Sequence, residues 1–226
     1  MGARRWEQFA AASGIAFVVV ILISFLLPGE APPQFDDSIQ EIQSFYVDNG
    51  DALQAAAFLT GLAAFFFLWF LGRLRSAMAR AEGEAGRLSS VAFGAGILVL
   101  ALALGSTAVG DVLAVRVAQI GDPAVTRALF ELQNLTIAFS SFAFAALVAA
   151  ASVVAVRTGL LPPWLAVAGE LLTLGWLVVG IGVFVEQGAF SSTGAFGLIV
   201  FLVWLVWVVA VSVSLVAPNE AEGTMS

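Results

Sequence analysis

The sequence contains no cysteine, histidine or lysine, and each absence removes a class of chemistry. Without cysteine and histidine the chain forms no disulfides and lacks thiol nucleophiles, thiolate or imidazole zinc ligands and histidine-ligated haem. Without lysine it cannot form the Schiff base that retinal needs, and without histidine it cannot hold a Ser-His-Asp triad. We therefore expect no catalytic residues, no metal site and no cofactor, and we predict that the protein is not an enzyme.

Charge is also scarce, because only 11% of the 226 residues are charged and 61% are hydrophobic. Ordinary globular domains are roughly 25% charged. A soluble domain of this length has too little core volume to bury so much apolar surface, so the lipid bilayer is the expected solvent. The net charge of -7 and the absence of a basic stripe exclude a nucleic-acid partner.

Six stretches are long and apolar enough to cross a bilayer, since a spanning helix needs about 20 apolar residues. The sequence thus predicts an all-α fold in which residues 1–226 form a single membrane domain, a bundle of six transmembrane helices. The first stretch is longer than the apolar part of a signal peptide, so we expect it to remain as a span. We expect the tail, residues 217–226, to be disordered. The predicted spans are residues 7–27, 53–72, 88–110, 135–156, 164–185 and 195–216.

The distribution of arginine predicts the orientation of these spans. With the N-terminus inside, seven arginines fall on the inner side, and only Arg116 and Arg127 fall on the outer side. An excess of basic residues marks cytoplasmic segments. We therefore expect a multi-pass protein of a bacterial plasma membrane with both termini in the cytoplasm.

The outer loop, residues 28–50, is predicted to contain a short amphipathic helix. Ser38 followed by Glu41 fits a capping box, in which each side chain accepts a hydrogen bond from a free backbone N–H at the helix start. Ile39, Ile42, Phe45 and Tyr46 recur at helical spacing and would lie against the bundle or the lipid headgroups. Such a helix could seal the ends of the spans, or it could act as a gate or a docking surface.

The third and fourth spans continue into a hairpin that should protrude on the outer side and turn near residue 121. In a regular antiparallel pair its two acids and two arginines would form adjacent layers, one turn apart, and Gln133 belongs to the same outer cluster. One reading is an ion-pair network that holds the hairpin together, and the other is the mouth of a cavity for a small solute or ion. The candidate residues are Asp111, Arg116, Arg127, Glu131 and Asn134.

Glu170 is the acid predicted to lie deepest in a span, about 9 Å inside the inner end of residues 164–185. An ionisable side chain within a membrane is costly and raises the question of a functional role. At this depth a neutral Glu170 could donate a hydrogen bond to a serine such as Ser152 or Ser212, or it could reach Arg157. A proton or cation relay is the functional alternative.

Glycines within the spans are expected to let helices approach closely, because helix association in lipid depends on small residues. Gly14, Gly94, Gly96 and Gly180 are examples. Gly180 and Gly182 could instead mark a broken helix at a binding site.

Five short segments are distributed along the chain: Arg-Trp-Glu at 5–7, Leu-Leu-Pro-Gly-Glu at 26–30, Trp-Phe-Leu-Gly-Arg-Leu at 69–74, Arg-Leu-Ser-Ser-Val-Ala-Phe-Gly at 87–94 and Gly-Asp-Pro-Ala at 121–124. With these segments the chain resembles a set of uncharacterised actinobacterial integral membrane proteins. The resemblance covers nearly the whole chain. It implies six helices and brings no activity, ligand or site residues with it.

These observations favour a non-enzymatic membrane protein that acts by helix packing, as a subunit or accessory partner. Its expected partners are the lipid bilayer and either another membrane protein or a second copy of the chain. The alternative is a small transporter or channel for a proton, ion or small solute, which would use Glu170 and the polar residues of the outer hairpin.

Overall fold

The computed structural model describes residues 3–83, 86–185, 188–191 and 194–216, with side chains from residue 12 onward. These residues form helices and no strand, which confirms the predicted all-α class. A π turn (Leu113–Val117) joins α4 to α5, and a 3-10 turn (Gly182–Phe184) follows α7. The predicted disordered tail lies outside the described residues. The helices are α1 (Ala3–Leu26), α2 (Ile39–Asp48), α3 (Gly50–Glu82), α4 (Arg87–Val112), α5 (Ala118–Ile120), α6 (Pro123–Thr158), α7 (Pro163–Ile181) and α8 (Ala195–Val216).

Five described helical segments are long and apolar enough to cross a membrane. The chain therefore has the architecture of an integral membrane protein. The helix α1 is 24 residues long, and the described apolar part of it, Ala12–Leu26, is shorter than the other five segments. Those five are Gly50–Glu82, Arg87–Ile120, Pro123–Thr158, Pro163–Phe184 and Ala195–Val216.

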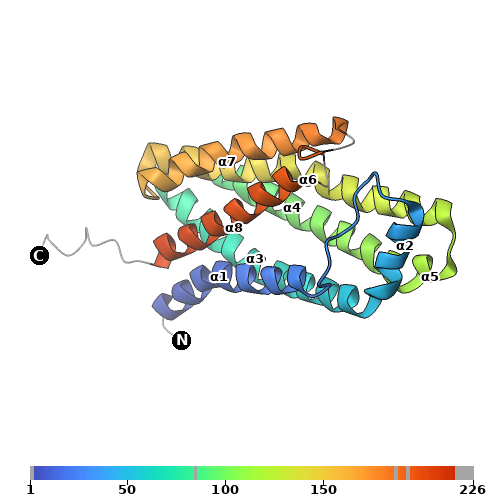
Figure 1. Cartoon of the computed structure of the whole chain (residues 1–226). Coiled ribbons are helices and arrows are strands. Elements are labelled where there is room, and N and C mark those ends of the chain that lie inside the picture. The colour runs from blue at the N-terminus through green and yellow to red at the C-terminus, as the bar shows by residue number, and fades with distance from the viewer. Residues whose placement is uncertain (1–2, 84–85, 186–187, 192–193, 217–226) are drawn as a thin grey trace, which may run out of the picture.

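The long helices run side by side, and α2 lies across one end of them (Figure 1). The most extensive pairings are α4 with α6, α1 with α3 and α6 with α7, while α8 packs against α1 and α7. At the α2 end, α4 to α6 extend past the ends of α1, α7 and α8. The helix α6 has 36 residues and is ~54 Å long, whereas a bilayer core is ~30 Å thick. We call the protruding part, residues 39–48 and 113–131, the head.

The opposite end of the bundle is longer than the sequence predicted, because α3 does not end at Gly72. It continues for almost three further turns to Glu82. Leu74, Ala77 and Met78 are buried in this extension, at the three- and four-residue spacing of one helix face. Their packing stabilises the helical extension. The sequence predicted a loop here, because the segment contains several arginines.

The centre of the bundle is filled by aromatic rings around Trp204 of α8. Its indole is 1% exposed, and its centre lies 4.7 Å from that of Phe144, in an edge-to-face arrangement. Phe144 in turn stacks on Trp176 at 4.2 Å. Aromatic pairs at such distances contribute beyond the area that they bury. The other rings around Trp204 are those of Phe17, Phe67 and Phe201.

Glycines create several of the close helix contacts. The Cα of Gly14 on α1 faces the Ser212 hydroxyl of α8, and a Cβ added at Gly14 would overlap that hydroxyl. Gly96 faces Leu71, and Gly180 faces a phenylalanine ring of α6, in similar contacts. Gly94 instead faces open space. The helix α7 runs through Gly180 before its α-helical part ends, so this glycine serves close packing.

Candidate functional site

The head has a small hydrophobic core of its own, separate from the core around Trp204. Ile42 and Tyr46 on α2 pack against Leu113, Ala114 and Phe130 of the hairpin. Ile42 is fully buried although α2 is only 10 residues long. A helix this short is marginal in water by itself, so its packing on the hairpin stabilises it.

A capping box begins α2, as the sequence predicted. The Ser38 hydroxyl oxygen accepts a hydrogen bond from the backbone N–H of Glu41 at 3.3 Å, and the Glu41 carboxylate accepts one from the backbone N–H of Ser38 at 2.8 Å. The Ser38 hydroxyl also donates to that carboxylate at 2.7 Å. These hydrogen bonds, the one from the Ser38 side chain first, favour the charged form and lower the pKa of Glu41.

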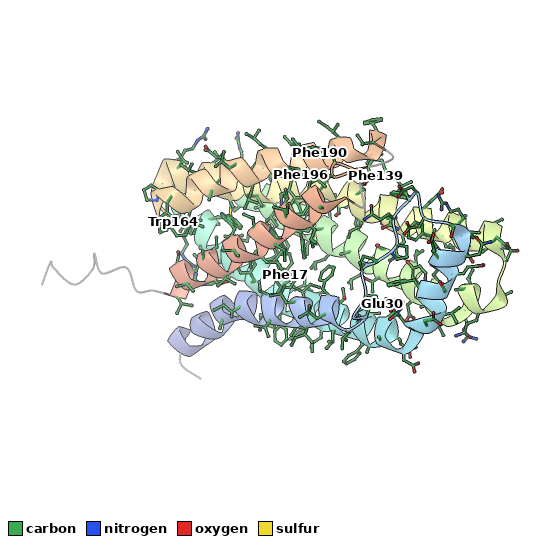
Figure 2. All side chains as sticks on the ribbon, viewed as in Figure 1. Phe17, Glu30, Phe139, Trp164, Phe190 and Phe196 are labelled. Carbon is green, nitrogen blue, oxygen red and sulfur yellow. The ribbon has the colours of Figure 1, made fainter. Side chains whose placement is uncertain are left out.

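Arg127 fastens the chain that precedes α2 to α6. Its Nε lies 2.8 Å from the carboxylate of Glu131, one turn further along α6. One of its terminal nitrogens donates to the backbone carbonyl of Asp37 at 3.1 Å, and the other donates to that of Phe35. Glu30 adds a further link, since its carboxylate accepts a hydrogen bond from Asn49 at the end of α2. Figure 2 labels Glu30 beyond the end of α1.

Tyr46 joins α2 to the hairpin through Gln133. The Tyr46 hydroxyl donates to Gln133 Oε1 at 2.9 Å, and Ser106 on α4 donates to the backbone carbonyl of Gln133 at 2.9 Å. Gly110 on α4 leaves room for the Gln133 side chain. Burial raises the pKa of Tyr46 well above its usual range, so the phenol stays protonated as a donor. One feature of the sequence could have indicated this hydrogen bond. Tyr46 is the one tyrosine of the chain and lies on the apolar face of α2, where its hydroxyl needs a partner.

The structure brings together only part of the predicted outer cluster. Arg127 and Glu131 form an ion pair, whereas Arg116 is exposed on the π turn. Asp111 is half-buried, and its Oδ1 has no partner among the described residues. Asn134 donates to a backbone carbonyl of its own helix. The predicted layers assumed a regular helix, and the wider π turn changes the direction in which Arg116 points.

Glu170 lies on the outside of the bundle instead of facing its interior. Its side chain is exposed on α7, and it makes no hydrogen bond to the described residues. Ser152 and Ser212 are fully buried. Ser152 contacts α7 at Gly169, one position before Glu170 and therefore about 100° around the helix. The predicted serine hydrogen bond is thus not formed.

A cavity of about 360 Å³ lies where the head meets the start of α3. Its polar lining includes Asp48, Asp51 and Gln119. Across the part of the chain that the structure describes, no group of three or more Asp, Glu, His or Cys side chains could hold a metal ion. The remaining lining residues are Val47, Asn49, Gly50, Ala52, Gln54, Ala114 and Val115.

Comparisons with protein-family models, with curated proteins and with solved structures give no match for this chain. The resemblance to actinobacterial membrane proteins stays a prediction. The geometry around the head is informative by itself, because three of its polar side chains, Gln43, Tyr46 and Arg127, connect α2 and the chain before it to the α4–α6 hairpin.

Proposed function

We propose that the protein is a non-enzymatic subunit or accessory protein of a bacterial plasma membrane, with a head that docks a membrane-protein partner. In this proposal α1 is the sixth span, and the short helix α2 is the amphipathic helix of the first outer loop. Both termini lie in the cytoplasm, and the head lies outside the cell. The observation that carries the proposal is how the polar side chains are employed. In and around the head they hydrogen-bond α2 and the chain before it to the hairpin, whereas aromatic rings fill the centre of the bundle.

The hydrogen bonds of Arg127 support a structural role for the head. All three of its nitrogens donate hydrogen bonds, one to Glu131 and two to backbone carbonyls of the chain before α2. Hydrogen bonds to charged groups contribute about 1.5–3 kcal/mol each before solvent exposure is considered. A guanidinium held in this way orders a loop and is not free to bind a solute.

The packing of the bundle interior supports the same role. Trp204, Phe67 and Phe70 are each at most 1% exposed and come from two different helices. Glu170, the acid that the sequence offered for a relay, faces away from this interior. A solute route through the bundle would have to displace these rings.

The positions of the arginines support the orientation. At the end opposite the head, Arg73, Arg75 and Arg80 lie on α3, Arg87 begins α4 and Arg157 lies in the last turn of α6. Trp164, 64% exposed at the start of α7, lies toward the same end (Figure 2). Basic residues and interfacial tryptophan are typical of the cytoplasmic boundary of a membrane helix.

The head also exposes apolar side chains beyond the predicted bilayer. Ile120 is 79% exposed and Val125 is 45% exposed, on either side of the turn between α5 and α6. Val47 on α2 is 46% exposed. Exposed apolar side chains on a part of the molecule that projects past the other helices are suited to contact another protein.

Reconstitution tests the proposal directly. Purified protein in liposomes should not raise the flux of protons, monovalent cations or small neutral solutes above that of empty liposomes. In cells, a photocrosslinking residue in place of Ile120 should give one discrete adduct with a membrane protein, and the same residue in place of lipid-facing Leu174 should not. Flux that depends on the protein, or equal adducts at both positions, would contradict the proposal.

A small transporter is the second candidate, and unpartnered polar atoms favour it. Asp111 Oδ1 and the hydroxyls of Ser141 and Ser152 are buried without a hydrogen-bond partner among the described residues. Buried polar atoms usually have partners, so such atoms can mark places where a solute or water binds. If this candidate is correct, Asp111→Asn should abolish a flux that the wild-type protein supports in liposomes.

A further inference from the structure

A second cavity, of about 520 Å³, opens at the end of the bundle opposite the head. Three helix ends form it: the last turn of α3, the first residues of α4 and the last turns of α6. In the orientation given under Proposed function, on which this inference rests, this end of the bundle faces the cytoplasm. We therefore expect the cavity to lie near the headgroups of the inner leaflet. Its lining residues are Ala81, Glu82, Arg87, Leu88, Val153, Val154, Arg157 and Thr158.

Two arginines from different helices give this cavity its charge. Arg87 and Arg157 are both exposed and line the cavity from α4 and α6. The charged residue that α3 contributes to the lining is an acid, Glu82. Its carboxylate accepts hydrogen bonds from the backbone N–H groups of Leu88 at 3.0 Å and Ser89 at 2.7 Å, at the start of α4. The acid is thus engaged by a helix N-terminus, and the two guanidinium groups remain available to an anion.

The rest of the lining is mostly apolar. Leu88, Val153 and Val154 supply apolar walls beside the arginines in the lining. The Thr158 hydroxyl donates to the backbone carbonyl of Val154 at 2.7 Å. A ligand that fits both parts has an anionic group for the arginines and a hydrocarbon portion for the walls. Basic cavities between membrane helices on the cytoplasmic side bind anionic lipid headgroups in this way.

We propose that this cavity binds the phosphate headgroup of an anionic phospholipid. The phosphate lies between Arg87 and Arg157, and the upper part of an acyl chain lies along Leu88 and Val153. Arginine suits this role because its planar guanidinium can donate two parallel hydrogen bonds to one phosphate group. A free phosphate ion would use the same two arginines but would gain nothing from the apolar walls.

Native mass spectrometry of the full-length protein in detergent tests the proposal, with phosphatidylglycerol, phosphatidylcholine and inorganic phosphate as probes. Phosphatidylglycerol should be retained in preference to phosphatidylcholine, and inorganic phosphate at millimolar concentration should not displace it. The double variant Arg87→Gln and Arg157→Gln should lower affinity for phosphatidylglycerol about 25-fold, at roughly fivefold for each arginine near a membrane surface. Arg80→Gln is the matched control, because Arg80 is exposed at the same end of α3 but does not line the cavity.

A cavity-filling variant separates loss of the site from loss of the fold. Val153→Phe keeps both arginines but occupies the space of the acyl chain, so it should also reduce phosphatidylglycerol retention while thermal unfolding stays cooperative. Equal retention of the two lipids, or unchanged retention in the double variant, would overturn the proposal. Displacement of the lipid by inorganic phosphate would overturn the lipid assignment, since it would make the site one for a soluble anion.

Discussion

Arg127 and Glu131 form an ion pair one turn apart on α6, with the arginine Nε 2.8 Å from the glutamate Oε1. The pair orients the guanidinium so that its other two nitrogens reach the carbonyls of Phe35 and Asp37, about 90 positions earlier in the sequence. A contact between neighbours on one helix thereby fixes a long-range contact between the outer loop and the hairpin.

Replacing Arg127 should loosen the segment before α2. Arg127→Gln removes the ion pair and both carbonyl hydrogen bonds, and we expect it to lower the free energy of unfolding by about 1–2 kcal/mol, reduced from the buried value because the side chain is partly exposed. Hydrogen exchange of residues 34–48 should accelerate. Arg116→Gln is the control, since Arg116 is exposed on the π turn and should change neither quantity. Equal protection in the two variants would contradict this account.

The capping box predicts a response to acid. The pKa of Glu41 is lowered from its ordinary value of 4.5 by the hydrogen bonds with Ser38, so its stabilising effect on α2 is fully present above that value. It is lost as the pH falls through the lowered pKa and the carboxylate gains a proton. We therefore expect exchange of the α2 amides to accelerate as the pH is lowered through that pKa, which lies below 4.5. Glu41→Gln should remove the pH dependence of this step, and an unchanged acid profile in that variant would disprove the assignment.

Two glycines on the membrane helices should respond differently to alanine. Gly14→Ala places a methyl group against the Ser212 hydroxyl and the Phe70 ring, so it should lower the free energy of unfolding by about 1–3 kcal/mol. Gly94→Ala meets open space and should be neutral or stabilise by up to about 1 kcal/mol. Thermal unfolding in one detergent compares the two. Equal shifts would mean that close packing at Gly14 does not limit stability.

The absence of cysteine makes topology directly measurable, because any introduced cysteine is the only thiol. Ile120→Cys in the head should react with a membrane-impermeant maleimide added to intact cells. Arg80 is exposed on α3 at the opposite end of the bundle. Arg80→Cys should therefore react only after the membrane is permeabilised. Labelling of Arg80→Cys in intact cells would invert the proposed orientation.

The outward position of Glu170 predicts a gain of stability when its charge is removed. Glu170→Leu should raise the free energy of unfolding by about 1–3 kcal/mol, because a carboxyl group in lipid is costly. Leu174→Glu, one turn further along the exposed face of α7, should have the opposite effect. If Glu170→Leu instead dissociates an oligomer in detergent, the side chain pairs with another subunit and does not face lipid.

The helices could be predicted from the sequence because lipid imposes a simple requirement of length and hydropathy. The predicted span of residues 195–216 agrees with α8. The helix α6 begins with residue types that favour a helix start, with Asp122 as N-cap and Pro123 in the first turn. The extension of α3 beyond Gly72 was missed, because its arginines resemble a loop and the buried stripe of Leu74 and Met78 is short.

The candidate site was less predictable, because it depends on the directions in which side chains point. The depth of Glu170 follows from its position along a helix, but its direction depends on which neighbours pack against α7. The π turn at Leu113–Val117 has no signature in residue type, and it changes the relation of Arg116 to Arg127. The carbonyls of Phe35 and Asp37 carry no sequence signal at all.

The helix α3 lines both cavities with its two ends, since Gly50 and Asp51 border the one beneath the head and Ala81 and Glu82 border the one between the arginines. An uninterrupted α-helix of 33 residues behaves as a stiff rod ~50 Å long. Any rotation or piston movement of that rod would alter the walls of both hollows together, so only a ligand that moves α3 in one hollow would change the shape of the other.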